Sequence, residues 1–195
     1  PEYQLFEDTV YKDIAFGPKN MKLSESEIKE RVFRAAAFVG VKPEHMEKSP
    51  FDLSGGEKRR VAIAGVMAMK PEVLILDEPC AGLDPKGRNE LMSMIENYRK
   101  ATGATVMIVS HSMDDMARNA DRILVMNKGR LAMYGKVQDI FSNADKLIEM
   151  GLSVPAATSL VSRLGRALPD LETDVFTAED AAELLSSYYK RRKAQ

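Results

Sequence analysis

The chain has 195 residues, with 28 Lys and Arg against 29 Asp and Glu, so its net charge is -1. A single domain with at most a small appendage fits this length, and the balanced charge gives no support to broad electrostatic binding of nucleic acid. One cysteine excludes a disulfide framework, and no apolar run reaches the ~18 residues that a membrane span needs. We therefore expect a soluble, cytoplasmic, mixed globular protein.

The first fifty residues predict a small helical unit. Residues 1–6 contain no initiator Met and no element start, which suggests a fragment of a longer protein. Residues 7–16 follow as a short helical stretch, closed by Gly17-Pro18. Ser24-Glu25-Ser26-Glu27 is a capping box, and apolar residues at helical spacing continue from it as far as Gly40.

The middle of the chain predicts alternating helices and strands. Residues 57–69 are apolar nearly all round after Arg60, which is typical of a buried helix. The continuous apolar runs at 73–76 and 105–109 predict strands buried on both faces of a parallel sheet. A helix that ends near residue 100 lies between these strands, and this order indicates an α/β fold.

The last third predicts smaller elements. A short helix is expected at 113–119. The turn sequence Asn127-Lys128-Gly129 predicts a hairpin between flanking strands. Further helices are expected at 137–141, 156–164 and 178–189. The basic run 190–193 is interpreted as a solvated last turn that complements the dipole of its helix.

Ser54-Gly55-Gly56-Glu57 is the first segment that points to chemistry. A capping box explains Ser54 and Glu57, but not two glycines in a first turn, each of which costs ~1 kcal/mol against Ala. Lys58, Arg59 and Arg60 follow, although cations oppose the helix dipole at this end. Open backbone, free N–H groups and nearby cations together predict an anion site.

Asp77 and Glu78 follow the first predicted strand at its carboxyl end, where ligands of open α/β sheets bind. An Asp there can hold Mg²⁺, directly or through water, and the next Glu can orient or deprotonate a water. The alternative is an ordinary strand exit with two solvated acids. Cys80 is interpreted as a small buried filler rather than a nucleophile, because no suitable His or Asn accompanies it in sequence.

Ala81-Gly82-Leu83-Asp84 comes next, and Asp84 is the expected N-cap of a helix with Pro85 at its first position. If the segment is functional, it would also contact a partner subunit, in addition to capping the helix.

Ser110-His111-Ser112 leaves the second predicted strand. If the two strands are neighbours, His111 lies at the same sheet edge as Asp77 and Glu78, where an imidazole can bond a γ-phosphate. The alternative is a polar strand exit. The other histidine, His45, has no such company in sequence and is expected on the surface.

These motifs resemble those of ABC ATPases in order and in spacing. Ser54 to Glu57 resembles the signature, Val73 to Glu78 resembles Walker B with the catalytic Glu, Ala81 to Asp84 resembles the D-loop, and Ser110-His111 resembles the switch-histidine loop. The flanks are similar to the ATP-binding subunit of energy-coupling factor (ECF) transporters. The flanking segments are residues 1–6, 15–20, 60–66 and 112–117.

The resemblance covers nearly the whole chain and implies its organisation. It implies a partial ABC nucleotide-binding domain at 1–142, made of a helical subdomain at 1–52 and of a signature helix and α/β core at 53–142. Residues 143–195 would form a helical C-terminal extension.

The resemblance also implies the site. ATP would lie between two ATPase subunits, identical or different, and would meet Ser54, Gly55, Gly56, Glu57 and Asp84. Asp77 would hold Mg²⁺, Glu78 would polarise the attacking water, and His111 would contact the γ-phosphate. The subunits would work with a membrane T component and a substrate-binding S component, at the cytoplasmic face of the cell membrane, in uptake of vitamins or of cobalt and nickel ions.

Three features limit the match. The family usually has Gln where this chain has Glu57, and a commoner Thr or Ala where it has Cys80. The chain contains no G-x-x-x-x-G-K-[ST] phosphate-binding motif, which in this family lies just upstream of residue 1. We therefore expect the C-terminal two thirds of a subunit, inactive by itself.

Two alternatives remain open from the sequence. One is a DNA-repair or chromosome-maintenance ATPase, which would bring heptad segments and a basic surface excess. The other is a non-hydrolysing module.

Overall fold

The computed structural model describes residues 4–168 and 170–193, so residues 1–3 of the first ECF-like segment lie outside the described residues. The chain divides into two compact units, Pro1–Val109 (unit 1) and Ser110–Gln195 (unit 2), and each unit has hydrophobic clusters of its own. The functional boundary expected at residue 142 stays a prediction.

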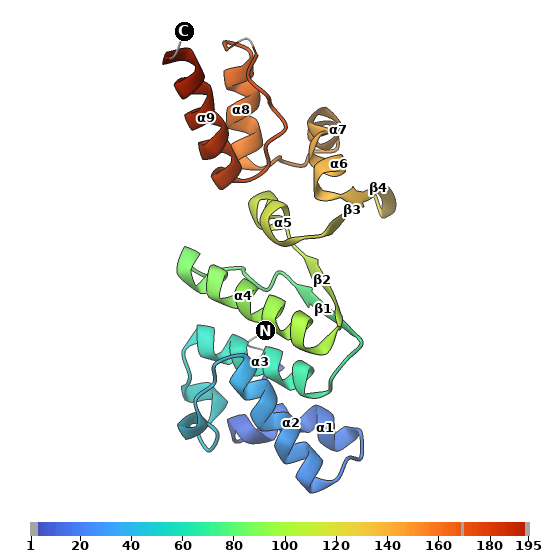
Figure 1. Cartoon of the computed structure of the whole chain (residues 1–195). Coiled ribbons are helices and arrows are strands. Elements are labelled where there is room, and N and C mark those ends of the chain that lie inside the picture. Colours follow the sequence, from blue (N-terminus) through green and yellow to red (C-terminus); the bar gives the residue numbers. More distant parts are fainter. Residues whose placement is uncertain (1–3, 169, 194–195) are drawn as a thin grey trace. The chain divides into compact units, whose positions relative to one another are not determined.

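Within its described residues, unit 1 combines the α-helices α1 to α4 with a short parallel sheet (Figure 1). Its elements are α1 (Val10–Asn20), α2 (Glu25–Phe38), the 3₁₀ turns Pro43–His45 and Pro50–Asp52, α3 (Gly55–Ala68), β1 (Val73–Asp77), α4 (Pro85–Thr102) and β2 (Thr105–Val109). Helices α1, α2 and α3 pack against one another, and one hydrophobic cluster extends from them to β1 and α4.

Helix α1 continues through the Gly17-Pro18 pair that was expected to close it. It begins after Thr9, whose Oγ1 accepts from the Lys12 N–H at 3.2 Å. Pro18 is fully buried in the last turn, where its ring has no N–H to bond the preceding turn. An added Cβ on Gly17 would lie 2.6 Å from Cγ of Met69, so this glycine permits packing rather than ending the helix.

Helix α2 confirms the predicted N-cap but only half of the predicted capping box. The Oγ of Ser24 accepts from the Glu27 N–H at 3.3 Å. The Glu27 carboxylate accepts instead from Arg31 Nη2 at 2.7 Å, one turn along the helix. The run ends as expected beside Gly40, whose φ of 67° suits a glycine.

Strands β1 and β2 pair in parallel, as predicted, but they are not buried on both faces. Leu74 and Leu76 lie in the core, whereas Val73 and Ile75 are 54% and 61% exposed. In β2, Met107 likewise lies on the exposed side. Side chains alternate between the faces of a strand, and within the described part of unit 1 only one face of this sheet is covered.

Unit 2 contains α5 (Met113–Asn119), β3 (Arg122–Asn127), β4 (Arg130–Lys136), α6 (Val137–Phe141), α7 (Ala144–Glu149), α8 (Ala156–Gly165) and α9 (Ala178–Lys193). The predicted hairpin is confirmed. Lys128 and Gly129 both have positive φ, the conformation of a two-residue hairpin turn. Helix α7 was not predicted. Across the described ranges, no helix combines the length and apolarity needed to cross a bilayer.

Candidate functional site

A complete capping box holds the N-terminus of α3. Ser54 Oγ accepts from the Glu57 N–H at 3.4 Å, and Glu57 Oε2 accepts from the Ser54 N–H at 3.0 Å and from the Ser54 hydroxyl at 2.6 Å. These bonds from Ser54 hold the pKa of the Glu57 carboxyl below its ordinary value. The carboxylate is therefore ionised at neutral pH, at the helix end that favours negative charge.

Among the described residues, nothing gives Gly56 a steric reason to be glycine. Its φ lies outside the left-handed region, and a Cβ added there would meet nothing within 4 Å. Gly87 differs, because a Cβ there would lie 2.8 Å from Asp84 Oδ1. Ser54, Gly55 and Gly56 are all exposed. The first turn of α3 thus presents backbone that a ligand from outside the chain can approach closely.

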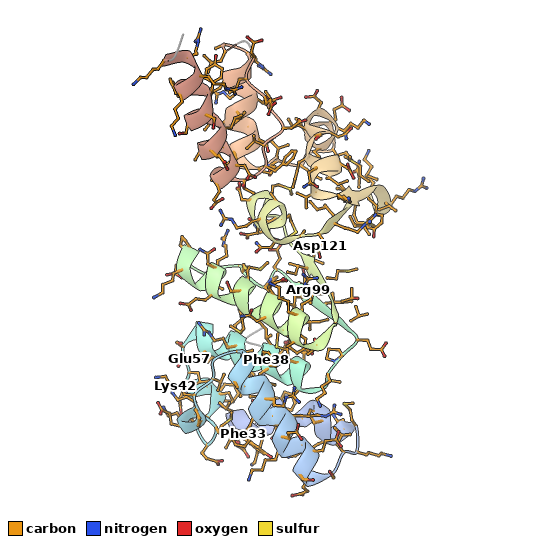
Figure 2. The ribbon with its side chains drawn as sticks, in the orientation of Figure 1. Phe33, Phe38, Lys42, Glu57, Arg99 and Asp121 are labelled. Atoms are coloured by element: carbon orange, nitrogen blue, oxygen red, sulfur yellow. The ribbon has the colours of Figure 1, made fainter. Side chains whose placement is uncertain are left out.

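His45 lies beside this capping box, which corrects the expectation that it is a surface residue. Its side chain is 14% exposed, and Nδ1 lies 3.5 Å from Glu57 Oε1. The 3₁₀ turn Pro43–His45 carries the imidazole to the start of α3, where Figure 2 labels Glu57. The two residues are twelve apart in sequence and in different elements, so no local pattern could have indicated this pair.

Two of the three cations that follow the capping box bind other elements of unit 1. Arg59 Nη1 donates to the carbonyl of Ala81 at 2.6 Å. Arg60 Nη2 donates to Glu90 Oε2 at 2.8 Å, which joins α3 to α4. These two side chains thus join α3 to the segment after β1 and to α4.

Asp77 and Glu78 lie at the carboxyl edge of the sheet. Asp77 is the last residue of β1, exposed, and opposite Val109 in the parallel ladder. The Glu78 N–H donates to the Val109 carbonyl at 2.9 Å. The φ of Glu78 is 45°, a strained conformation for a residue with a Cβ, and such strain clusters at functional sites.

Two successive turns carry the chain from Glu78 into α4. The Ala81 N–H donates to Glu78 O at 3.1 Å, and the Leu83 N–H donates to Cys80 O at 3.2 Å. Gly82, with φ of 73°, makes the left-handed step between them. Cys80 is buried, as predicted for a filler.

Asp84 caps α4 as predicted, because its Oδ1 accepts from the Gly87 N–H at 2.8 Å. A cavity of about 320 Å³ separates the starts of α3 and α4. Its lining residues come from both helices and from the segment between β1 and α4. They are Gly56, Arg59, Arg60, Leu83, Asp84, Lys86, Gly87, Glu90 and Leu91.

His111 belongs to unit 2, where it is exposed. The residues beside it form a local turn, in which the Ser112 N–H donates to Ser110 Oγ at 3.1 Å and Ser112 caps α5. The approach of His111 to Asp77 and Glu78 stays a prediction.

The described residues contain no cluster of three or more His, Cys, Asp or Glu that could enclose a metal ion. Asp77 alone still suits Mg²⁺, which is held by one or two carboxylates together with waters and substrate phosphates.

Known proteins with similar sequences are ABC transporter components. The family model for ABC transporters matches residues 2–81. The energy-coupling factor transporter ATP-binding protein EcfA2 of Caldanaerobacter subterraneus subsp. tengcongensis is 51% identical over 193 residues, which cover 99% of this chain and 68% of the relative. The Clostridium perfringens protein of the same name is 50% identical over 186 residues, which cover 95% of this chain and 65% of that relative. The chain thus spans about two thirds of the length of these relatives.

Solved structures agree with the sequence relatives. The structure of CbiO1 from Clostridium perfringens, described as part of the ABC transporter complex CbiONQ, superposes with a TM-score of 0.68 at 38% identity, over 86% of this chain and 63% of that chain. A dimeric bacterial ABC transporter cassette superposes with a TM-score of 0.57 at 26% identity, over 66% of this chain and 56% of that chain. The predicted partial ABC nucleotide-binding fold is confirmed. With relatives of this identity and coverage, the chain belongs to the family of ATP-binding proteins of energy-coupling factor transporters, which are ABC-type ATPases.

Proposed function

We propose that this chain supplies the signature, Walker B, D-loop and switch-histidine segments of an ATPase subunit that energises an ECF-type importer of vitamins or transition-metal ions. The observation that carries the proposal is the backbone of Glu78. Its carboxylate follows a strand end directly, and its N–H is tied to the neighbouring strand at Val109 while its φ is strained. A residue held in this way is suited to a fixed catalytic position.

Hydrolysis assigns a role to each acid and base. The Glu78 carboxylate accepts a proton from the attacking water, whose oxygen bonds to the γ-phosphorus. The bond from that phosphorus to the β–γ bridging oxygen breaks, its electron pair stays on ADP, and phosphate leaves. His111 donates a hydrogen bond to a γ-phosphate oxygen, where negative charge must be stabilised.

Asp77 is the residue proposed to hold Mg²⁺, directly or through water. When bound, the ion neutralises charge on the phosphate oxygens. The exposed carboxylate of Asp77 at the sheet edge fits this task.

The start of α3 is proposed to receive ATP that a second subunit holds. Gly55 and Gly56 would present backbone N–H donors to the γ-phosphate, which fits the open space at Gly56. Ser54 would join them by turning its hydroxyl proton from Glu57 Oε2 toward the phosphate. The ionised Glu57 is unsuited to a phosphate and would accept from a hydroxyl of the nucleotide. Asp84, which also caps α4, lines the same cavity as Gly56 and would contact the nucleotide from that side.

The assembly follows from the same proposal. A second ATPase subunit, identical or different, would complete the site. Closure of the two subunits on ATP would then move a membrane T component, which works with a substrate-binding S component. The subunit would then work at the cytoplasmic face of the cell membrane. Residues 1–142 would form the ATPase part of this chain, and residues 143–195 the helical extension.

The test uses a subunit that carries a Walker A segment ahead of this sequence. Glu78→Gln keeps size and hydrogen bonding but removes the base, so single-turnover hydrolysis should fall ~10²–10⁴-fold. Nucleotide affinity should persist, because it depends mainly on the Walker A segment. The matched control is Glu72→Gln, an exposed acid just before β1, which should hydrolyse like wild type. Undiminished hydrolysis in Glu78→Gln would remove Glu78 from the catalytic role.

A further inference from the structure

We propose that Arg59 is a positioning residue that ties the signature helix to the D-loop (Ala81–Asp84) of the same subunit, so that nucleotide at the start of α3 governs the segment that follows Glu78. This inference rests on the proposed function and assigns a role to a residue that the motif itself does not include.

The contact joins two segments far apart in sequence. Arg59 Nη1 donates to the Ala81 carbonyl at 2.6 Å, across 22 residues. Arg59 lies in the second turn of α3. Its bond to Ala81 has a charged donor, and such hydrogen bonds are stronger than neutral ones.

The exposed start of the D-loop is held to α3 by the Arg59 side chain. Ala81 and Gly82 are exposed, and Gly82 has a left-handed φ of 73°. The two backbone bonds of this segment, from Ala81 N–H to Glu78 O and from Leu83 N–H to Cys80 O, are both local turns. Leu83 packs against the hydrophobic cluster of unit 1, which includes residues of α3. The bond from Arg59 adds a direct polar contact between α3 and the exposed Ala81.

The neighbouring arginine has a different task. Arg60 donates to Glu90 of α4 and reaches the Val39 carbonyl at the end of α2 at 3.5 Å, so it fastens helices to one another. Arg59 lines the 320 Å³ cavity between α3 and α4 and is partly exposed. Truncating Arg59 therefore leaves no new void in a packed core, and the fold should tolerate the change.

The link has a direct consequence for catalysis. Ala81 donates to the Glu78 carbonyl, so a shift of Ala81 is felt at the backbone of the proposed base. Helix α3, whose first turn carries Gly56, is thus joined to the backbone of Glu78 through Arg59 and Ala81. Arg59 touches neither ATP nor the attacking water in this arrangement.

Amide hydrogen exchange tests the link without reference to activity. The experiment uses the subunit that carries a Walker A segment. In its Arg59→Ala variant, the Leu83 amide hydrogen should exchange ~3–10-fold faster than in wild type, because loss of the Arg59 bond loosens the turn that protects this amide. Arg59→Lys keeps a cationic donor and should restore most of the protection. The control is Arg34→Ala, an exposed arginine of α2 paired with Glu30 at 3.4 Å, which should leave Leu83 unchanged.

Exchange at the buried Ile95 of α4 separates positioning from global destabilisation. The proposal expects Ile95 to exchange as in wild type in every variant. Unchanged Leu83 exchange in Arg59→Ala, or equal acceleration at Leu83 and Ile95, would overturn it.

Hydrolysis gives the second readout. Arg59→Ala should lower single-turnover hydrolysis about tenfold while the affinity for ATP stays within twofold, and Arg59→Lys should recover most of the rate. Faster exchange at Leu83 with an unchanged rate of hydrolysis would show that the contact only supports the fold, and it would refute the positioning role. If Glu78→Gln hydrolyses normally, the proposed function fails, and the exchange experiment still decides whether Arg59 holds the D-loop.

Discussion

The backbone N–H of Glu78 donates to the carbonyl of Val109 at 2.9 Å, one residue beyond the last pair of the parallel ladder, Asp77 opposite Val109. This bond ties Glu78 to the neighbouring strand although its φ of 45° departs from strand geometry. Asp77 and Glu78 thus differ in backbone conformation although they are adjacent in sequence. Asp77 ends a regular strand, whereas Glu78 begins the turns that lead to Ala81 and α4.

Gly56→Asp should fold normally but fail in ATP-driven dimerisation. The added side chain meets open space, and an acid suits a helix N-terminus, so the melting temperature should stay within ~2 °C of wild type. A negative charge where a γ-phosphate must sit should cost about 1–3 kcal/mol of dimer closure. ATP-dependent dimerisation in the Glu78→Gln background measures this.

Gly56→Ala is the matched variant for that experiment, because it adds a Cβ without charge. It should fold equally well and impair dimerisation less than Gly56→Asp. Dimerisation that is unaffected by the aspartate would show that this turn does not meet the nucleotide.

Ser54→Ala should destabilise the fold by ~1 kcal/mol at neutral pH, the usual effect of losing an N-cap. It should also raise the pKa of Glu57 toward the ordinary value of 4.5, because the Ser54 hydroxyl bond is the main cause of the lowered pKa. Urea unfolding and NMR titration of the Glu57 carboxyl carbon measure the two effects.

The pH dependence of that variant has a definite sign. A folded-state pKa below the unfolded value contributes stability above the unfolded pKa, and this contribution is lost as pH falls through the folded pKa. The stability gap between wild type and Ser54→Ala should therefore narrow below pH 4.5. Ser93→Ala, at an exposed site of α4, should show no such narrowing. A constant gap across this pH range would contradict the assignment to Glu57.

Two substitutions in β1 test the one-sided burial of the strand in the 195-residue chain. Leu74→Ala removes a fully buried side chain and should cost ~2–5 kcal/mol of unfolding free energy. Ile75→Ala alters a side chain that is 61% exposed and should cost less than ~1 kcal/mol. Denaturant unfolding of both variants gives the comparison, and equal losses would mean that both faces are buried.

The 195-residue chain by itself should release phosphate from ATP only at background rate. Its sequence has no G-x-x-x-x-G-K-[ST] loop to hold the β- and γ-phosphates. Mg²⁺-dependent phosphate release measures this, and a Glu78→Gln version of the same chain identifies any contaminating ATPase. Turnover that matches a subunit with the loop, and that Glu78→Gln abolishes, would prove the expectation wrong.

Patterns within a few residues predicted part of the local structure of this protein. Ser54 with Glu57, and Asp84 with Pro85, are helix starts whose bonds close within one turn, so spacing alone indicated them. The same holds for the hairpin turn at Lys128 and Gly129. The proposed chemistry of the motifs also rests on residue type and order, because acids at a strand end suit a metal ion and glycines at a helix start suit an anion.

Only the tertiary structure decided the features that depend on distant partners. Helix α1 passes through Gly17 because Met69 packs there, and His45 meets Glu57 because a 3₁₀ turn folds back on α3. The bond from Arg59 to Ala81 is of the same kind. A hydrophobic run shows that a strand is apolar but not which of its faces finds a covering element. Local sequence specifies short-range bonds, whereas long-range contacts exist only once the whole unit has packed.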